Sequence, residues 1–187
     1  MGKTTILTHL AKQIKQNFPS HWIVRIDLND HTDALKAQKE QKIEAVEFLS
    51  QRLLKLDSPF EKDVFEQCLK EGKVVVMLDG VDEISPSYER TVIDLLQALK
   101  EKSVEQLWVT TRPHLRETLE KNLKAHSYTL EPFSKVDQVE FLTKFWCQKL
   151  NLQGTSQQQL EMYATEIIEK LEQSINDRDK QFSGVPI

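Results

Sequence analysis

The sequence predicts an α/β fold in which helices cover both faces of a parallel β-sheet. One observation is the run of five apolar residues at 74–78, Val-Val-Val-Met-Leu, which is typical of a strand buried on both faces. Another is the alternation of strand and helix patterns along most of the chain, because parallel strands need crossover helices between them. Apolar residues make up 39% of the 187 residues, so the chain can form a core.

The first predicted helix follows residues 2–4, because the next apolar residues recur at helical spacing: Ile6, Leu7, Leu10, Ala11 and Ile14. Residues 18–20, Phe-Pro-Ser, end this helix, and a strand is expected at 21–28. Between residues 33 and 56 the apolar pattern indicates one long helix or two shorter ones. The polar run at 36–42 interrupts it, and we interpret this run as a solvated face or a loop.

The middle of the chain carries clear boundary signals. Pro59 begins a helix where its missing N–H costs nothing, and Gly72 ends that helix as a left-handed stop. After the buried strand, a helix is expected from the spacing of Val92, Ile93, Leu96 and Leu99. Further strands are predicted at residues 107–113 and 128–130.

Beyond Phe133 the strand patterns stop and two helices are expected. Ser134 is the predicted cap of the first helix. The two helices are marked by Val136, Val139, Leu142, Phe145 and Trp146, and by Leu160, Tyr163, Ile167, Leu171 and Ile175. We therefore predict an α/β core over residues 1–132. Residues 133–187 are predicted to be the first part of a small helical domain.

The composition argues against several classes of partner. The formal net charge is −4 with both signs interleaved, so no basic stripe suggests a nucleic acid or an anionic membrane surface. No stretch approaches the roughly 20 apolar residues of a membrane span. Cys68 and Cys147 lie on predicted helices among apolar residues, which favours buried free thiols and a cytoplasmic location.

The chain opens with Gly2, Lys3 and Thr4, which match the end of the phosphate-binding P-loop, or Walker A motif, G-x-x-x-x-G-K-[ST]. In that motif the lysine neutralises the β- and γ-phosphates and the hydroxyl binds Mg²⁺. Thr5 either contacts the α-phosphate or caps the helix. The rest of the loop and its strand are expected upstream of Met1. The chain is therefore predicted to be a fragment of a P-loop NTPase whose parallel sheet, flanked by helices, lacks its first strand.

Asp79 supplies the matching Walker B motif at the end of the buried strand, the edge where α/β proteins bind ligands. It is expected to hold the metal through water. Asp82 and Glu83 are candidates to orient or activate the attacking water, the alternative being a solvated acidic turn. The sequence leaves open which of Asp82 and Glu83 would take this role.

These motifs, in their order, resemble the NACHT family of signal-transduction ATPases over nearly the whole chain. The motif segments are Gly2-Lys3-Thr4, Leu78-Asp79-Gly80-Val81-Asp82-Glu83, Thr110-Thr111-Arg112-Pro113, Leu130-Glu131-Pro132-Phe133-Ser134 and Gly184-Val185-Pro186. The Walker B segment is the most specific, because general P-loop ATPases more often place a glutamate where Gly80 stands.

The resemblance implies two further site residues. Arg112 resembles the family's sensor arginine, and it lies at the end of a strand that should neighbour the Walker B strand. In that role it would report whether a γ-phosphate is present. The alternative is a surface ion pair. Pro186 resembles the proline that lies against the adenine, a plain helix breaker being the alternative. The expectation that the nucleotide is ATP or ADP, and not GTP, rests on the resemblance alone.

The resemblance implies a regulatory ATP/ADP switch that requires Mg²⁺, hydrolyses ATP slowly and drives self-association and signalling, as in innate immunity. One alternative is a P-loop kinase-like phosphotransferase, although the sequence shows no acceptor-binding lid or additional arginine cluster. Another is a nucleotide-binding scaffold without turnover. The trigger and the pathway depend on domains expected outside this sequence.

Overall fold

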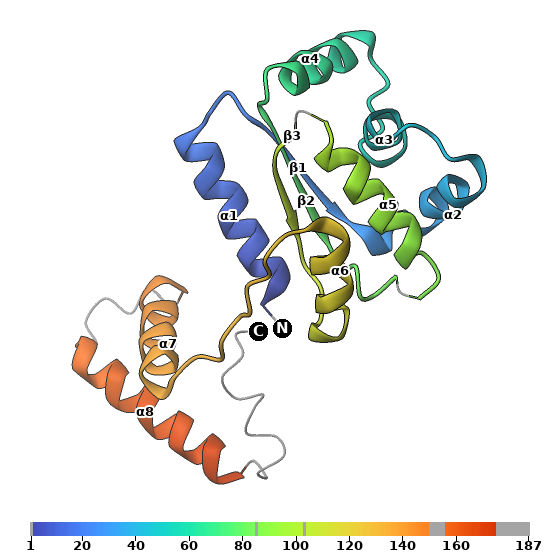
Figure 1. Cartoon of the computed structure of the whole chain (residues 1–187). Helices are drawn as coiled ribbons and strands as arrows, with labels where there is room; N and C mark the ends of the chain where they lie inside the picture. Colours follow the sequence, from blue (N-terminus) through green and yellow to red (C-terminus); the bar gives the residue numbers. More distant parts are fainter. Residues whose placement is uncertain (1, 85, 103, 150–155, 175–187) are drawn as a thin grey trace. The chain divides into compact units, whose positions relative to one another are not determined.

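The computed structural model describes residues 2–84, 86–102, 104–149 and 156–174. Residues 3–128 form one compact unit, and the two helices that follow residue 134 belong to a second. The first unit has the predicted α/β architecture (Figure 1).

The sheet of the first unit consists of three parallel strands in the order β1-β2-β3. These are β1 (Trp22–Asp27), β2 (Val74–Asp79) and β3 (Val104–Val109). In the register of β1 and β2, Asp27 lies opposite Asp79. All six residues of β2 are buried, which confirms the strand buried on both faces.

Helix α1 (Lys3–Asn17) covers one face of the sheet. Its residue Leu7 is 1% exposed and packs with Val75 and Met77 of β2. Full burial of a leucine side chain contributes about 1.5–3 kcal/mol. The start of the chain is therefore held against the central strand.

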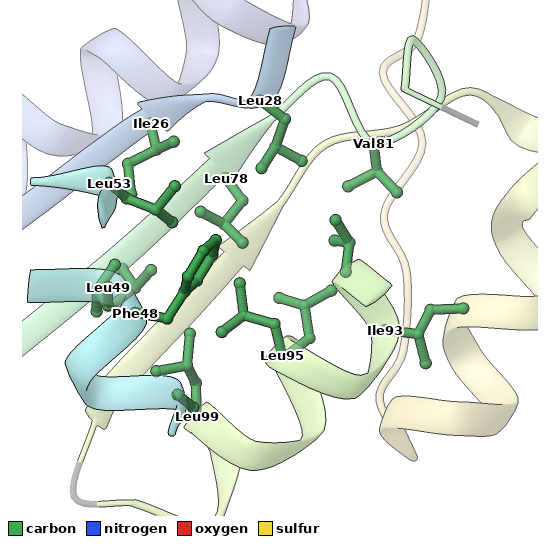
Figure 2. Close-up of a cluster of buried hydrophobic side chains, with 14 of the residues drawn as sticks. Ile26, Leu28, Phe48, Leu49, Leu53, Leu78, Val81, Ile93, Leu95 and Leu99 are labelled. Carbon is green, nitrogen blue, oxygen red and sulfur yellow. The ribbon is translucent and has the colours of Figure 1, made fainter. Parts of the chain in front are cut away.

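The opposite face carries the larger core, to which β2 contributes Val74, Val76 and Leu78. Figure 2 shows Leu78 among side chains from several elements: Ile26, Leu28, Phe48, Leu49, Leu53, Val81, Ile93, Leu95 and Leu99. The helical segments on this face are η1 (Leu28–His31), α2 (Thr32–Gln41), α3 (Ala45–Glu47), η2 (Phe48–Leu53), α4 (Pro59–Lys70), α5 (Glu89–Lys100), η3 (Pro113–Leu115) and α6 (Arg116–Leu123).

The predicted helix boundaries around Pro59 and Gly72 are confirmed. Pro59 is the first residue of α4, and Gly72 follows its end with a φ of +65°. The polar run at residues 36–42 is the solvated part of α2 rather than a loop, and Lys42 ends that helix in the left-handed conformation. The region therefore contains two helical segments, since α3 and η2 follow each other directly.

Two strand predictions need correction. β3 begins and ends earlier than residues 107–113, so Thr110 and Arg112 follow the strand instead of lying in it. The strand predicted at residues 128–130 is wrong: Tyr128 and Leu130 are 89% and 42% exposed, and the segment is neither strand nor helix. Three residues with a strand-like pattern form no strand unless a neighbouring strand supplies backbone partners.

The second unit contains the two expected helices, α7 (Lys135–Lys149) and α8 (Gln157–Ser174), which pack against each other. The Ser134 hydroxyl accepts a hydrogen bond from the backbone N–H of Asp137 at 3.2 Å, as expected of a cap. Ile175 lies outside the described residues. The prediction of two buried thiols is wrong for Cys147, which is exposed, whereas Cys68 is half-buried; both are free.

Candidate functional site

Polar side chains gather at the carboxyl edge of the sheet. Asp79 is the last residue of β2, and Thr110 follows directly after β3. Since the three strands are parallel, their carboxyl ends meet at this edge, where α/β folds bind ligands.

The Asp79 side chain is held on one side only. The residue is 4% exposed, and its Oδ1 accepts a hydrogen bond from the Thr110 hydroxyl. Its Oδ2 is buried without a hydrogen-bond partner in the described part of the protein. A buried carboxylate oxygen without a partner is costly, so Oδ2 fits a site for a metal ion or its water.

This edge also fits the way in which proteins hold Mg²⁺. Within the described residues, no group of three or more His, Cys, Asp or Glu side chains gathers to form a metal cage. Mg²⁺ is instead commonly held by one or two carboxylates together with substrate phosphates and water. Asp79 can supply that carboxylate.

The loop after β2 makes a tight turn at Gly80. This residue has a φ of +81°, which favours glycine, and its carbonyl accepts the backbone N–H of Glu83 at 3.0 Å. An added Cβ would lie 3.6 Å from the Glu83 side chain, an ordinary contact. The backbone conformation, not a lack of space, therefore requires the glycine.

Asp82 lies between two cations. Its Oδ1 is 2.8 Å from Lys3 Nζ, and its Oδ2 is 2.9 Å from Arg112 Nε. The Asp82 side chain is only 2% exposed, against 23% for Lys3 and 70% for Arg112. One buried carboxylate thus connects the predicted phosphate-binding lysine with the predicted sensor arginine.

The charge state of Asp82 follows from these contacts. Burial raises the pKa of this carboxyl, but the hydrogen bond and charge of Lys3, with the charge of Arg112, outweigh burial. The pKa of Asp82 therefore lies below its usual range, and the carboxylate is ionised at neutral pH.

Glu83 has a different environment although it is the next residue. It is exposed, and its Oε2 accepts a hydrogen bond from the Asn29 side chain of η1. No ion pair involves Glu83 among the described residues. An amide thus orients the Glu83 carboxylate without neutralising it.

Helix α1 begins at Lys3, next to Gly2, which has a φ of +89°. The first backbone N–H groups of a helix lack intrahelical partners and favour anions. Thr4 and Thr5 are exposed in this first turn, and neither hydroxyl forms a hydrogen bond within the described residues. The first turn of α1 therefore offers two hydroxyls without partners among the described residues, beside N–H groups of the kind that favour anions.

The structure therefore brings together Lys3, Asp82 and Arg112, and separately joins Asp79 to Thr110. Pro186 lies outside the described residues. Sequence reasoning missed the contacts of Thr110 and Asn29. The threonine pair near the end of the strand predicted at residues 107–113 was a visible signal for Thr110, but its partner depends on the register of β2 and β3.

Comparisons with known proteins agree with the P-loop architecture. A family model described as the NACHT domain matches residues 1–149. Searches of curated proteins and of solved structures each found no match. Among the described residues, none of the helices combines the length and apolar character that a membrane crossing requires.

Proposed function

Because the chain belongs to the NACHT family of P-loop NTPases, we propose that it binds ATP and ADP with Mg²⁺ and acts as a switch. The nucleotide would control self-association and signalling in the cytoplasm, with innate immunity as the setting that the family resemblance suggests. The convergence of Lys3 and Arg112 on Asp82 carries this proposal, because it gathers at one point the two cations that the proposal assigns to the phosphates.

The two cations suit the phosphates of a nucleotide. Phosphate oxygens accept charge-assisted hydrogen bonds from ammonium and guanidinium groups, as a carboxylate does. Asp82 is therefore the internal counter-ion of Lys3 and Arg112, and a phosphate competes with it for both. Arg112 is 70% exposed and lies between β3 and η3, so a γ-phosphate can reach it and compete with Asp82.

Magnesium is assigned to Asp79 and Thr4. The unpartnered Oδ2 of Asp79 supports this assignment, and the exposed Thr4 hydroxyl supplies the P-loop ligand. When bound, the metal neutralises charge on the β- and γ-phosphates. Thr5 and the N–H groups of the first turn of α1 complete the phosphate contacts. Pro186 is proposed to lie against the adenine.

Glu83 is better placed than Asp82 to take a proton from the attacking water. Both oxygens of Asp82 face cations and its pKa is lowered, which makes that carboxylate a weak base. Glu83 is exposed, and its carboxylate accepts a hydrogen bond from the neutral Asn29 amide and forms no ion pair among the described residues. We therefore assign a slow hydrolysis step to Glu83, and to Asp82 the holding of Lys3 and Arg112.

Measurements on the purified protein separate this function from its alternatives. Binding of ATP and ADP is followed by calorimetry, phosphate release by a colorimetric assay, and molar mass by light scattering. A switch predicts nucleotide binding, slow release of phosphate, and a larger mass with ATP than with ADP. Binding without turnover and with equal masses would indicate a scaffold. Transfer of the phosphate to an added acceptor would indicate a phosphotransferase.

A further inference from the structure

We infer that Thr110 is a positioning residue for the metal site: its hydroxyl holds Oδ1 of Asp79 and so leaves Oδ2 for the ion. This inference rests on the proposed nucleotide and Mg²⁺ binding and extends it to a residue outside the metal's own ligands. Thr110 follows β3, and Asp79 ends the neighbouring strand β2.

The Thr110 hydroxyl both donates and accepts a hydrogen bond at this position. It donates its one proton to Asp79 Oδ1 and accepts a hydrogen bond from the backbone N–H of Gly80 at 3.3 Å. A hydroxyl has a single donor, so the bond to Asp79 determines its direction. Thr110 thus connects the end of β2 to the first residue of the loop that carries Asp82 and Glu83.

The backbone of Thr110 fixes where that hydroxyl lies. Its N–H donates to the Leu78 carbonyl at 3.0 Å, and its carbonyl accepts the N–H of Val81 at 3.2 Å. These bonds continue the pairing of β2 and β3 past the end of β3. The hydroxyl is therefore placed by the sheet, which is more rigid than a free loop.

Asp79 needs such a partner because its two oxygens have different tasks. The residue is 4% exposed, Oδ1 is engaged by Thr110, and Oδ2 is buried without a partner among the described residues. A carboxylate free to rotate about its last side-chain bond would present either oxygen. The hydrogen bond to one oxygen restrains the plane of the carboxylate and so the place of the other oxygen, as outer partners do for metal ligands elsewhere.

The neighbouring Thr111 provides a matched control. Its Oγ1 is also buried, but it has no hydrogen-bond partner among the described residues. A threonine-to-valine change keeps the shape of the side chain and removes only the hydroxyl. Thr110→Val and Thr111→Val therefore differ in the two hydrogen bonds of the Thr110 hydroxyl, which it donates to Asp79 and accepts from the Gly80 N–H.

The experiment compares ATP affinity by calorimetry with Mg²⁺ and with EDTA, for the parent protein and for Thr110→Val, Thr110→Ser and Thr111→Val. The ratio of the ATP affinity with Mg²⁺ to the ATP affinity in EDTA should be about 10–100-fold smaller in Thr110→Val than in the parent protein. Changes to the outer partners of metal ligands have effects of this size. The ATP affinity of Thr110→Val in EDTA should be unchanged, because the contacts of Lys3 with phosphate remain. Thr110→Ser should restore the parent ratio, and Thr111→Val should keep it.

Direct binding of Mn²⁺ to the ADP-loaded protein, followed by electron paramagnetic resonance, gives a second readout that needs no turnover. An unchanged metal affinity in Thr110→Val, or an equal loss in Thr111→Val, would overturn the positioning role. If Thr110→Val does not fold, Thr110→Ala against Thr110→Ser makes the same comparison. A parent protein that binds no nucleotide would instead refute the proposed function.

Discussion

Lys3 Nζ lies 2.8 Å from Asp82 Oδ1, although the two residues are 79 positions apart. Helix α1 carries the lysine and the turn after β2 carries the aspartate. Arg112 reaches the other oxygen of the same carboxylate at 2.9 Å. An anionic side chain thus already occupies the two cations that the proposed function assigns to phosphates.

Replacement of Lys3 by alanine should remove most of the ATP affinity. A charge-assisted contact of this kind contributes about 1.5–3 kcal/mol, or roughly a 10–150-fold change in the dissociation constant. Calorimetry on Lys3→Ala measures this loss. Lys12→Ala is the control, because Lys12 is an exposed lysine on the same helix and should leave the affinity unchanged. An ATP affinity equal to that of the parent protein in Lys3→Ala would show that the P-loop assignment is wrong.

The two adjacent acidic residues should give opposite phenotypes. Glu83→Gln should slow hydrolysis by about 10²–10⁴-fold while ATP stays bound, because a water-activating base is lost. Asp82→Asn should tighten ATP binding by about tenfold, since Lys3 and Arg112 lose the carboxylate that competes with phosphate. Phosphate release and calorimetry test the pair together. If Asp82→Asn alone abolished turnover with ATP bound, the assignment to Glu83 would be wrong.

The Asp82 ion pairs should also make stability depend on pH. The pKa of Asp82 is lower in the folded protein than the value of about 3.9 expected when unfolded. The ionised form of Asp82 is therefore favoured by folding, and its contribution to the free energy of unfolding is complete above about pH 5. It is lost as the pH falls from about 4 through the folded pKa.

Thermal unfolding between pH 7 and pH 3 checks this sign. The parent protein should be more stable than Asp82→Asn at neutral pH, and the difference should shrink below about pH 4. A difference that stays constant over this range would mean that the charge of Asp82 contributes nothing to folding.

Gly80 and Gly72 allow strain to be separated from function. Both have a positive φ, +81° and +65°, so alanine at either position should destabilise the protein by about 1–2 kcal/mol. Only Gly80→Ala should also weaken Mg²⁺-dependent ATP binding, because Gly80 bonds to Thr110 and carries the turn to Asp82. Chemical denaturation and calorimetry measure the two effects. An equal loss of binding in Gly72→Ala would show that the effect is general destabilisation.

The sequence by itself determined the elements whose signals are local. The five apolar residues at 74–78 predicted the central strand, and the apolar spacing after Lys3 predicted α1. Pro59 and Gly72 marked the ends of α4 and the turn that follows it. Each signal reflects backbone conformation or burial along a few neighbouring residues, which the composition of that segment largely decides.

Only the tertiary structure decided which chemical groups meet. The pairing of Asp82 with Lys3 and Arg112, and that of Asp79 with Thr110, depend on strand register and on where α1 packs. The failed strand at residues 128–130 has the same origin, since a strand exists only with a hydrogen-bonded neighbour. Contacts between distant residues are set by how the whole chain packs, and no local pattern encodes that.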